Sequence, residues 1–213
     1  VFIDCNLQGL DLSRRDLTDT EFQNCNLIDT IFTDATFEHT ILRDCQLESV
    51  DLSGVKLINM DFQNAQLKNA NFSRCHIENC DFSESDLGDA NFQAAFMDYV
   101  SFENANLTGV RFTESMFEDC NVEGASLEES DLTKAKFTGV VLSNIDLTKL
   151  VIKETEFILS DLSGSNLASM DLSGCNFTDS DLTDTDLTGC NFDRAICNQT
   201  NFTQAQIVGG SFR

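Results

Sequence analysis

Nine cysteines are the residues best suited to chemistry, because thiolates bind metals, form disulfides and act as nucleophiles. They are Cys5, Cys25, Cys45, Cys75, Cys80, Cys120, Cys175, Cys190 and Cys197. No C-x-x-C pair occurs, and the two histidines, His39 and His76, lack zinc-finger spacing to any cysteine. We therefore interpret the cysteines as free structural thiols in a reducing, cytoplasmic setting, and we expect no metal and no cofactor.

Acidic side chains are the second candidate for chemistry. The sequence has 36 Asp plus Glu against 13 Lys plus Arg, a formal net charge of −23. The Asp-rich segment 179–186 lacks both the glycine-rich nonapeptide of calcium-binding β-rolls and the EF-hand loop, so we expect a solvated surface there. Without a desolvated carboxylate pair or neighbouring histidines, no catalytic residue can be assigned, and an enzyme is not expected.

The charge also limits the possible partners. A polyanion repels nucleic acids and anionic membranes and suits basic protein surfaces, or simply solubility. The 41% hydrophobic content is too high for disorder, so the acidic residues must cover something packed. No apolar run approaches the roughly 20 residues of a membrane span. We therefore expect a protein partner, no nucleic acid and no membrane.

A five-residue repeat organises the whole chain. From Phe2 onward every fifth residue is large and apolar, with 20 Leu and 17 Phe among 43 positions. The residue two places before is small at 36 of 42 positions. Residues two apart on an extended chain point the same way, so both face inward and the residue between them faces outward. The next two residues turn a corner. No insertion and no proline interrupts the register.

This pattern resembles the pentapeptide-repeat family, whose motif is A(D/N)LXX. Segments 70–74 (ANFSR), 90–94 (ANFQA) and 105–109 (ANLTG) match it directly. The resemblance implies an all-β, right-handed quadrilateral parallel β-helix with four pentapeptides per coil and no inserted loops. We expect one domain over residues 1–213, with ten to eleven coils in a rod ~50 Å long. Within the large apolar column, every twentieth residue from Leu7 to Leu187 is a leucine, and this recurrence supports four sides per coil.

Two surface features depart from the repeat's background. Residues 75–132 carry fourteen acidic side chains and one base, Arg111. These candidate acidic residues are Glu78, Asp81, Glu84, Asp86, Asp89, Asp98, Glu103, Glu114, Glu118, Asp119, Glu123, Glu128, Glu129 and Asp131. They predict an extended negative field, or a surface that only keeps a sticky repeat soluble.

The second feature is apolar. Phe96 is the only Phe outside the large apolar column, and Met116 takes the equivalent outward place one coil later. Tyr99, the only tyrosine, lies at the adjoining corner. Because contiguous exposed apolar groups usually mark a contact surface, we predict that Phe96, Tyr99 and Met116 form a patch for a partner or for self-association.

The family resemblance implies a function. Characterised bacterial members mimic B-form DNA, bind type II topoisomerases such as DNA gyrase and protect them from quinolones. Members of the Qnr type contact gyrase through loops that this chain lacks. Topoisomerase-binding members generally end in a capping helix, whereas the repeat here runs to Phe212 and Arg213. We therefore expect uncapped ends that self-associate or are covered by further chain. The alternative function is a structural or scaffolding interaction module, including a bacterial effector or a cyanobacterial protein.

Overall fold

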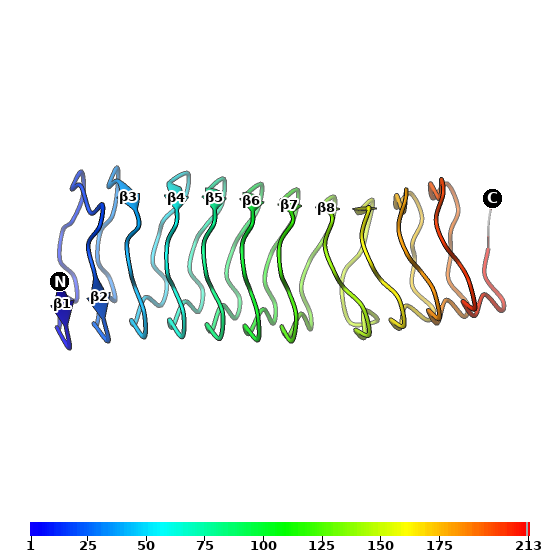
Figure 1. The fold of residues 1–213 in the computed structure, drawn as a ribbon, viewed down its shortest axis with the longest axis horizontal. Coiled ribbons are helices and arrows are strands. Elements are labelled where there is room, and N and C mark those ends of the chain that lie inside the picture. Colours follow the sequence, from blue (N-terminus) through cyan, green and yellow to red (C-terminus); the bar gives the residue numbers. More distant parts are fainter. Residues whose placement is uncertain (212) are drawn as a thin grey trace.

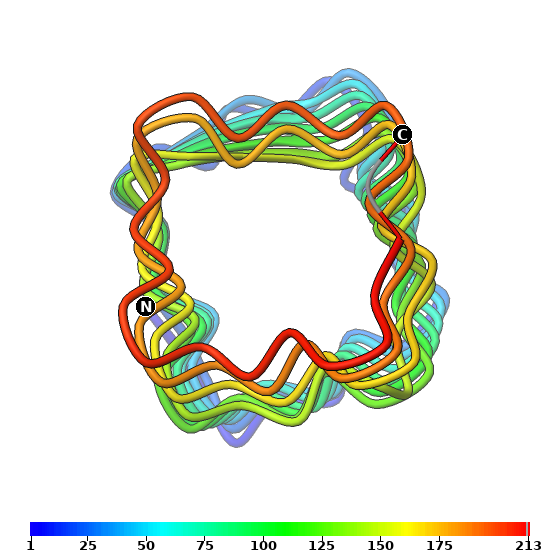
Figure 2. The ribbon, with the colours of Figure 1, turned by 90° about the vertical axis from the view of Figure 1, so that its right-hand side faces the viewer.

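The computed structural model describes residues 1–211 and 213 as a four-sided parallel β-solenoid (Figures 1 and 2). Each coil takes twenty residues, because residue i pairs in parallel with residue i+20 from Phe2↔Phe22 to Asn191↔Ser211. The predicted all-β, four-sided parallel β-helix is therefore confirmed. Phe212, on which part of the uncapped-end prediction rests, lies outside the described residues.

The four sides are named here by the first coil. Side A holds residues 1–4 and their equivalents every twenty residues, side B holds 6–9, side C holds 11–14 and side D holds 16–19. Side A carries β1 (Phe2–Ile3) and β2 (Phe22–Gln23). Side D carries β3 (Phe37–Glu38), β4 (Lys56–Ile58), β5 (His76–Glu78), β6 (Phe96–Asp98), β7 (Met116–Glu118), β8 (Lys136–Thr138) and β9 (Glu156–Ile158), which form one seven-stranded sheet.

The named strands span about eight turns, fewer than the ten to eleven coils predicted from the repeat. Beyond Ile158 the twenty-residue register continues as isolated bridges, such as Asp181↔Asn201. The difference arises because beyond Ile158 side D also makes only single bridges, such as Asn176↔Ile196. Side D alone has three extended residues per coil over most of the rod.

The core consists of the two predicted inward columns. Phenylalanines one coil apart stack face to face, with ring centroids 4.6 Å apart for Phe62–Phe82 and 4.7 Å for Phe72–Phe92. The same stacking occurs on side D, where the ring centroids of Phe117 and Phe137 lie 4.4 Å apart. Stacking and near-complete burial stabilise each coil against its neighbours.

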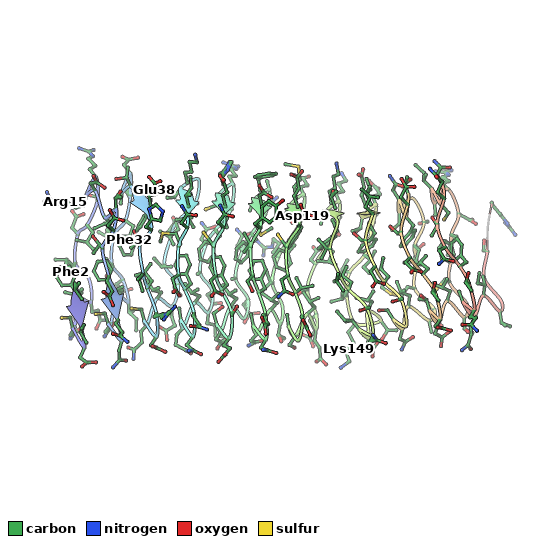
Figure 3. All side chains as sticks on the ribbon, in the orientation of Figure 1. Phe2, Arg15, Phe32, Glu38, Asp119 and Lys149 are labelled. Carbon is green, nitrogen blue, oxygen red and sulfur yellow. The ribbon has the colours of Figure 1, made fainter. Side chains whose placement is uncertain are left out.

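Small inward residues satisfy the backbone of the preceding coil. Cys75 Sγ donates a hydrogen bond to the Leu52 carbonyl at 2.9 Å, and Ser130 Oγ donates to the Leu107 carbonyl at 2.6 Å. All nine cysteines are free, seven of them are buried, and Cys5 and Cys197 are half-buried. The interpretation as structural thiols is thus confirmed for the seven. Arg15, which also takes an inward position, is exposed (Figure 3).

The corners explain the abundance of Asp, Asn and Gly. The second corner residue has a positive φ in nearly every pentapeptide, as at Asp89 (60°) and Gly109 (70°). Asn, Asp and Gly tolerate this left-handed conformation best. Outward Asp and Asn side chains accept bonds from the backbone two residues later, as when Ser13 N–H donates to Asp11 Oδ1 at 2.9 Å.

Within the described residues, the backbone ladder between coils is interrupted at three openings. Opening 1 separates residues 31–35 from 51–56 on side C and its corner with side D. Opening 2 separates 121–129 from 141–149 on sides A and B, where the coils stand visibly further apart in Figure 1. Opening 3 separates 151–154 from 171–174 on side C. The repeat pattern did not predict them.

Candidate protein-contact surfaces

The predicted apolar patch lies on the outer face of the sheet on side D. Phe96 of β6 and Met116 of β7 are direct register partners. Met116 is 42% exposed, whereas Phe96 is half-buried and its ring lies 5.1 Å from the imidazole of His76. The buried side chain of Met97 lies beneath them, as expected. The structure thus brings Phe96 and Met116 together.

Tyr99 lies on the same side, at the corner that directly follows β6. It is three residues beyond Phe96, so about 10 Å further along an extended strand, with the outward Asp98 between them. Its side chain is 61% exposed at a corner with a φ of 51°. The negative charge of the Asp119 carboxylate raises the pKa of Tyr99. The structure thus pairs Phe96 with Met116 and places Tyr99 at a corner of the same side, and contact among all three residues stays a prediction.

The patch belongs to a longer column. The outward residues that precede the core position on β4 to β8 are Lys56, His76, Phe96, Met116 and Lys136. The next outward column lies two residues later on each strand, and it includes Glu78, Asp98 and Glu118. An apolar centre flanked by cations along the rod and by acids across the strands can discriminate between partner surfaces by charge.

The fourteen candidate acidic residues spread over all four sides. Four lie on each of sides A, B and D, and only Glu114 and Asp131 lie on side C. Over the whole chain side A is the most acidic, with Arg43 as its single base, and its acids are Asp4, Glu21, Asp44, Asp61, Asp81, Glu84, Glu103, Glu123, Asp161, Asp181 and Asp184. Side C holds seven of the 13 bases, namely Arg14, Arg74, Arg111, Lys134, Lys153, Arg194 and Arg213. The rod therefore has electrostatically unequal sides.

The net charge gives the rod a DNA-like charge density. A net charge of −23 over a rod of about 50 Å corresponds to one charge per about 2 Å. B-form DNA carries one per about 1.7 Å of its axis. Few of these acids are neutralised internally, and the acid–Arg or acid–Lys pairs are Asp34–Arg14, Asp61–Arg43 and Glu128–Lys149.

Opening 1 forms a cleft with a volume of about 630 Å³. Its lining includes Phe32, Glu38, Asp51 and Lys56 from two successive coils, and Figure 3 labels Phe32 and Glu38 at its edge. A smaller cleft of about 480 Å³ lies at opening 3. Sequence reasoning did not find these sites, because every residue around opening 1 obeys the five-residue pattern.

Among the described residues, no group of three or more His, Cys, Asp or Glu side chains is placed to hold a metal ion. The same residues contain no helix long and apolar enough to cross a membrane. Burial raises the pKa of Cys45, Cys75, Cys80 and Cys120 to about 12, which makes these thiols poor nucleophiles.

These features define the class of protein as a pentapeptide-register β-solenoid with surfaces suited to binding. The sequence profile described as a pentapeptide repeat region matches residues 1–72 and 95–167, and that of pentapeptide repeats (8 copies) matches 160–196 and 180–213. The chain therefore belongs to the pentapeptide-repeat family. No curated protein matches it at comparable significance.

Solved structures with similarity include HetL, a pentapeptide repeat protein involved in heterocyst differentiation regulation from Nostoc sp. strain PCC 7120, at 22% identity and a TM-score of 0.44. That match covers 94% of this chain and 88% of HetL. Full-length QnrB1, a plasmid-mediated fluoroquinolone resistance protein, matches at 19% identity, a TM-score of 0.35 and 91% of each chain. A thylakoid-lumen protein of Arabidopsis thaliana matches at 25% identity and a TM-score of 0.37, over 50% of this chain and 67% of its own.

Proposed function

We propose that this chain is a non-enzymatic, cytoplasmic protein-binding rod whose acidic surface replaces DNA on a type II topoisomerase such as DNA gyrase. The observation that supports the proposal most is the charge density of one net charge per about 2 Å, close to that of B-form DNA. A DNA-binding surface is basic because it must neutralise phosphates, so it would also attract this rod. Sensitivity to quinolones would then change because the rod competes with DNA.

The test is a gyrase supercoiling assay with and without the protein, in the presence and absence of ciprofloxacin. A triple variant, Glu84→Gln/Glu103→Gln/Glu123→Gln, neutralises three exposed acids on side A in successive coils. We expect it to weaken inhibition or protection by about tenfold at low salt, with a smaller loss at high salt.

The matched control, Asp34→Asn/Glu114→Gln/Glu154→Gln, removes the same charge from side C, where bases are most frequent. If both variants lose activity equally, only total charge matters. If the unmodified protein neither inhibits gyrase nor protects it from ciprofloxacin, the gyrase proposal is wrong.

The second candidate function is a scaffold that binds through the Phe96–Met116 pair, because these two apolar side chains are direct neighbours in an outer column that is polar from Asp16 to His76 and from Lys136 to Asn176. Phe96→Asp should abolish any concentration-dependent increase in mass seen by light scattering. Ile196→Asp is the control, since Ile196 takes the equivalent outward position on side D and is 46% exposed. An unchanged mass in Phe96→Asp would remove this patch as the contact.

A further inference from the structure

Opening 1 leaves two facing strand edges without hydrogen-bond partners. On intact parts of side C, the core residue donates its N–H to the next coil, as Phe72 does to the Asn91 carbonyl at 2.7 Å. At opening 1 the equivalent N–H groups of Phe32, Asp34 and Asp51 make no such bond, and neither does that of Lys56. The carbonyls they would meet are those of Asp51, Ser53, Thr30 and Ala35. Unpaired edges of this kind are templates for an added strand.

The side chains that border the opening also lack the stacking of phenylalanine rings between coils. Phe32 lies between Leu12 and Leu52 in its column, whereas Phe72, Phe92 and Phe112 stack on one another. Phe32 packs instead on Phe37 of its own coil, at 5.5 Å and 60°. The adjacent rings of Phe32 and Phe37 in one coil therefore lie against leucines, not against further rings, in the next coil. The coils lose a ring stack at the place where their ladder is open.

The cleft has room and a defined chemistry. Its volume of about 630 Å³ lies within the roughly 300–1,000 Å³ of ligand pockets. Phe32, Ala35 and Phe37 form an apolar floor that stays at least 94% buried, so little space remains for a large inward side chain. The rim carries Asp34, Glu38 and Asp51 against the single base Lys56, and Thr18, Thr33, Thr36 and Ser53 supply hydroxyl groups.

We propose that opening 1 is a strand-addition site for an extended basic peptide, which enters between the two coils and pairs with both edges in the parallel direction. Inward positions of the peptide are small, such as Ala or Gly, because the floor is occupied by Phe32 and Phe37. Outward positions are Lys or Arg, because the rim is acidic. Opening 1 runs along side C and ends at its corner with side D, so a short straight strand fits along side C, whereas opening 2 extends over sides A and B. The site does not depend on gyrase binding, so failure of that assay leaves it unaffected.

The open edges are tested first by a cysteine-pair experiment. Coils in an intact ladder are about 4.8 Å apart, which falls within the Cα separations of about 4.4–6.8 Å that a disulfide requires. The pair Ser73→Cys/Gln93→Cys on an intact part of side C should therefore oxidise fully. The equivalent pair Thr33→Cys/Ser53→Cys at opening 1 should remain reduced, as read by mass spectrometry. Equal oxidation of both pairs would show a closed ladder and overturn the proposal.

Hydrogen exchange supplies an independent measurement on the unmodified chain. We expect the amides of Phe32, Asp34, Asp51 and Lys56 to exchange at least a hundredfold faster than their equivalents on intact coils. Those equivalents are Phe72, Arg74, Asn91 and Phe96, which donate at 2.7, 2.9, 2.9 and 2.9 Å. Equal protection of the two groups would contradict the open edges.

Peptide binding tests the occupant. The probe is acetyl-Lys-Ala-Lys-Ala-Lys-amide with a fluorescent label, and the readouts are anisotropy and slowed exchange at the four opening-1 amides. The matched control is the same peptide N-methylated at both alanines, which keeps the charge but cannot donate those bonds. We expect at least tenfold weaker binding of the control. Equal binding of both peptides, or binding without slowed exchange, would be electrostatic attraction to the rod and would overturn the proposal.

Discussion

Side C contains both the most regular and the most open parts of the solenoid. Between residues 70 and 114 its phenylalanines stack, its small column is Ala70, Ala90 and Val110, and every coil donates its backbone bonds to the next. At openings 1 and 3 the same side has lost those bonds. The comparison shows that inward and outward placement alone does not close the ladder. The residues stacked one coil apart must also match in size and shape.

Opening 3 illustrates the size requirement in the small column. Leu150 and Met170 occupy successive small positions on side C, where Ala, Ser, Thr, Cys or Val is usual. Ile145 is a similar exception beside opening 2, opposite Ala125. Extra methylenes force packed elements apart because interiors have few voids to accept them. At opening 2 the Lys149–Glu128 ion pair, at 2.8 Å, spans the gap, and Figure 3 labels Lys149 there.

Truncating a phenylalanine ring should give the largest difference in the free energy of unfolding between the regular part of side C and opening 1. Phe92→Ala removes a fully buried ring that stacks on Phe72 and Phe112, so we expect a loss of about 3–5 kcal/mol in the free energy of unfolding. Phe32→Ala should cost at least 1 kcal/mol less, since that ring has no stacked partner. Urea denaturation measures both. Equal losses in the two variants would show that ring stacking does not distinguish the regular part of side C from opening 1.

Alkaline pH tests the regular coils through their thiols. The pKa of Cys75 and of Cys80 is raised to about 12 in the fold from 9.0. Stability from these groups is therefore fully present below pH 9 and is lost as the pH rises from 9 towards 12, because the unfolded thiols ionise first. Each should cost about 1 kcal/mol at pH 10. Cys75→Ala/Cys80→Ala should flatten urea stability against pH between 9 and 11; an unchanged slope would assign the loss to other groups.

Side-chain exchange in the small column tests the explanation of opening 3. Ala90→Met inserts bulk into an intact ladder and should destabilise the protein by about 1–3 kcal/mol. Met170→Ala removes bulk next to an opening, so recovered backbone bonds should offset much of the lost burial, leaving a cost below about 1 kcal/mol. Hydrogen exchange at Asp171 should slow in the second variant. If it does not, bulk at position 170 is not what holds the coils apart.

The smallest effect concerns a strained corner. Leu159 has a φ of 53° and is 61% exposed, so it contributes little packing while adopting a conformation unfavourable to its side chain. Leu159→Gly should raise the free energy of unfolding by about 0.5–1 kcal/mol. Leu159→Ala, which keeps the Cβ atom, is the control and should gain much less. Thermal denaturation compares the three proteins, and equal gains would point to the exposed apolar surface instead.

The sequence was sufficient to predict the coil because its period of five leaves one geometry in which large and small residues both face inward. It also placed Phe96 beside Met116, since both occupy outward positions twenty residues apart. It placed Tyr99 at the corner of the same side, whereas contact between Tyr99 and the Phe96–Met116 pair stays a prediction. The openings escaped prediction because Phe32 obeys the pattern, and its ladder is intact towards Leu12 and lost only towards Leu52. Leu150 and Met170 were visible exceptions whose effect depends on three-dimensional stacking.

The twenty-residue register makes the length of this rod an adjustable property. Each coil contacts only the coil before and the coil after it, so duplicating one unit of twenty residues would lengthen the rod by about 4.8 Å without changing any other contact. Duplicating the unit 81–100 would also repeat Phe96 and the acids around it at a fixed spacing. A series of such chains would act as a molecular ruler, in which the reach of a bound partner could be measured in whole coils.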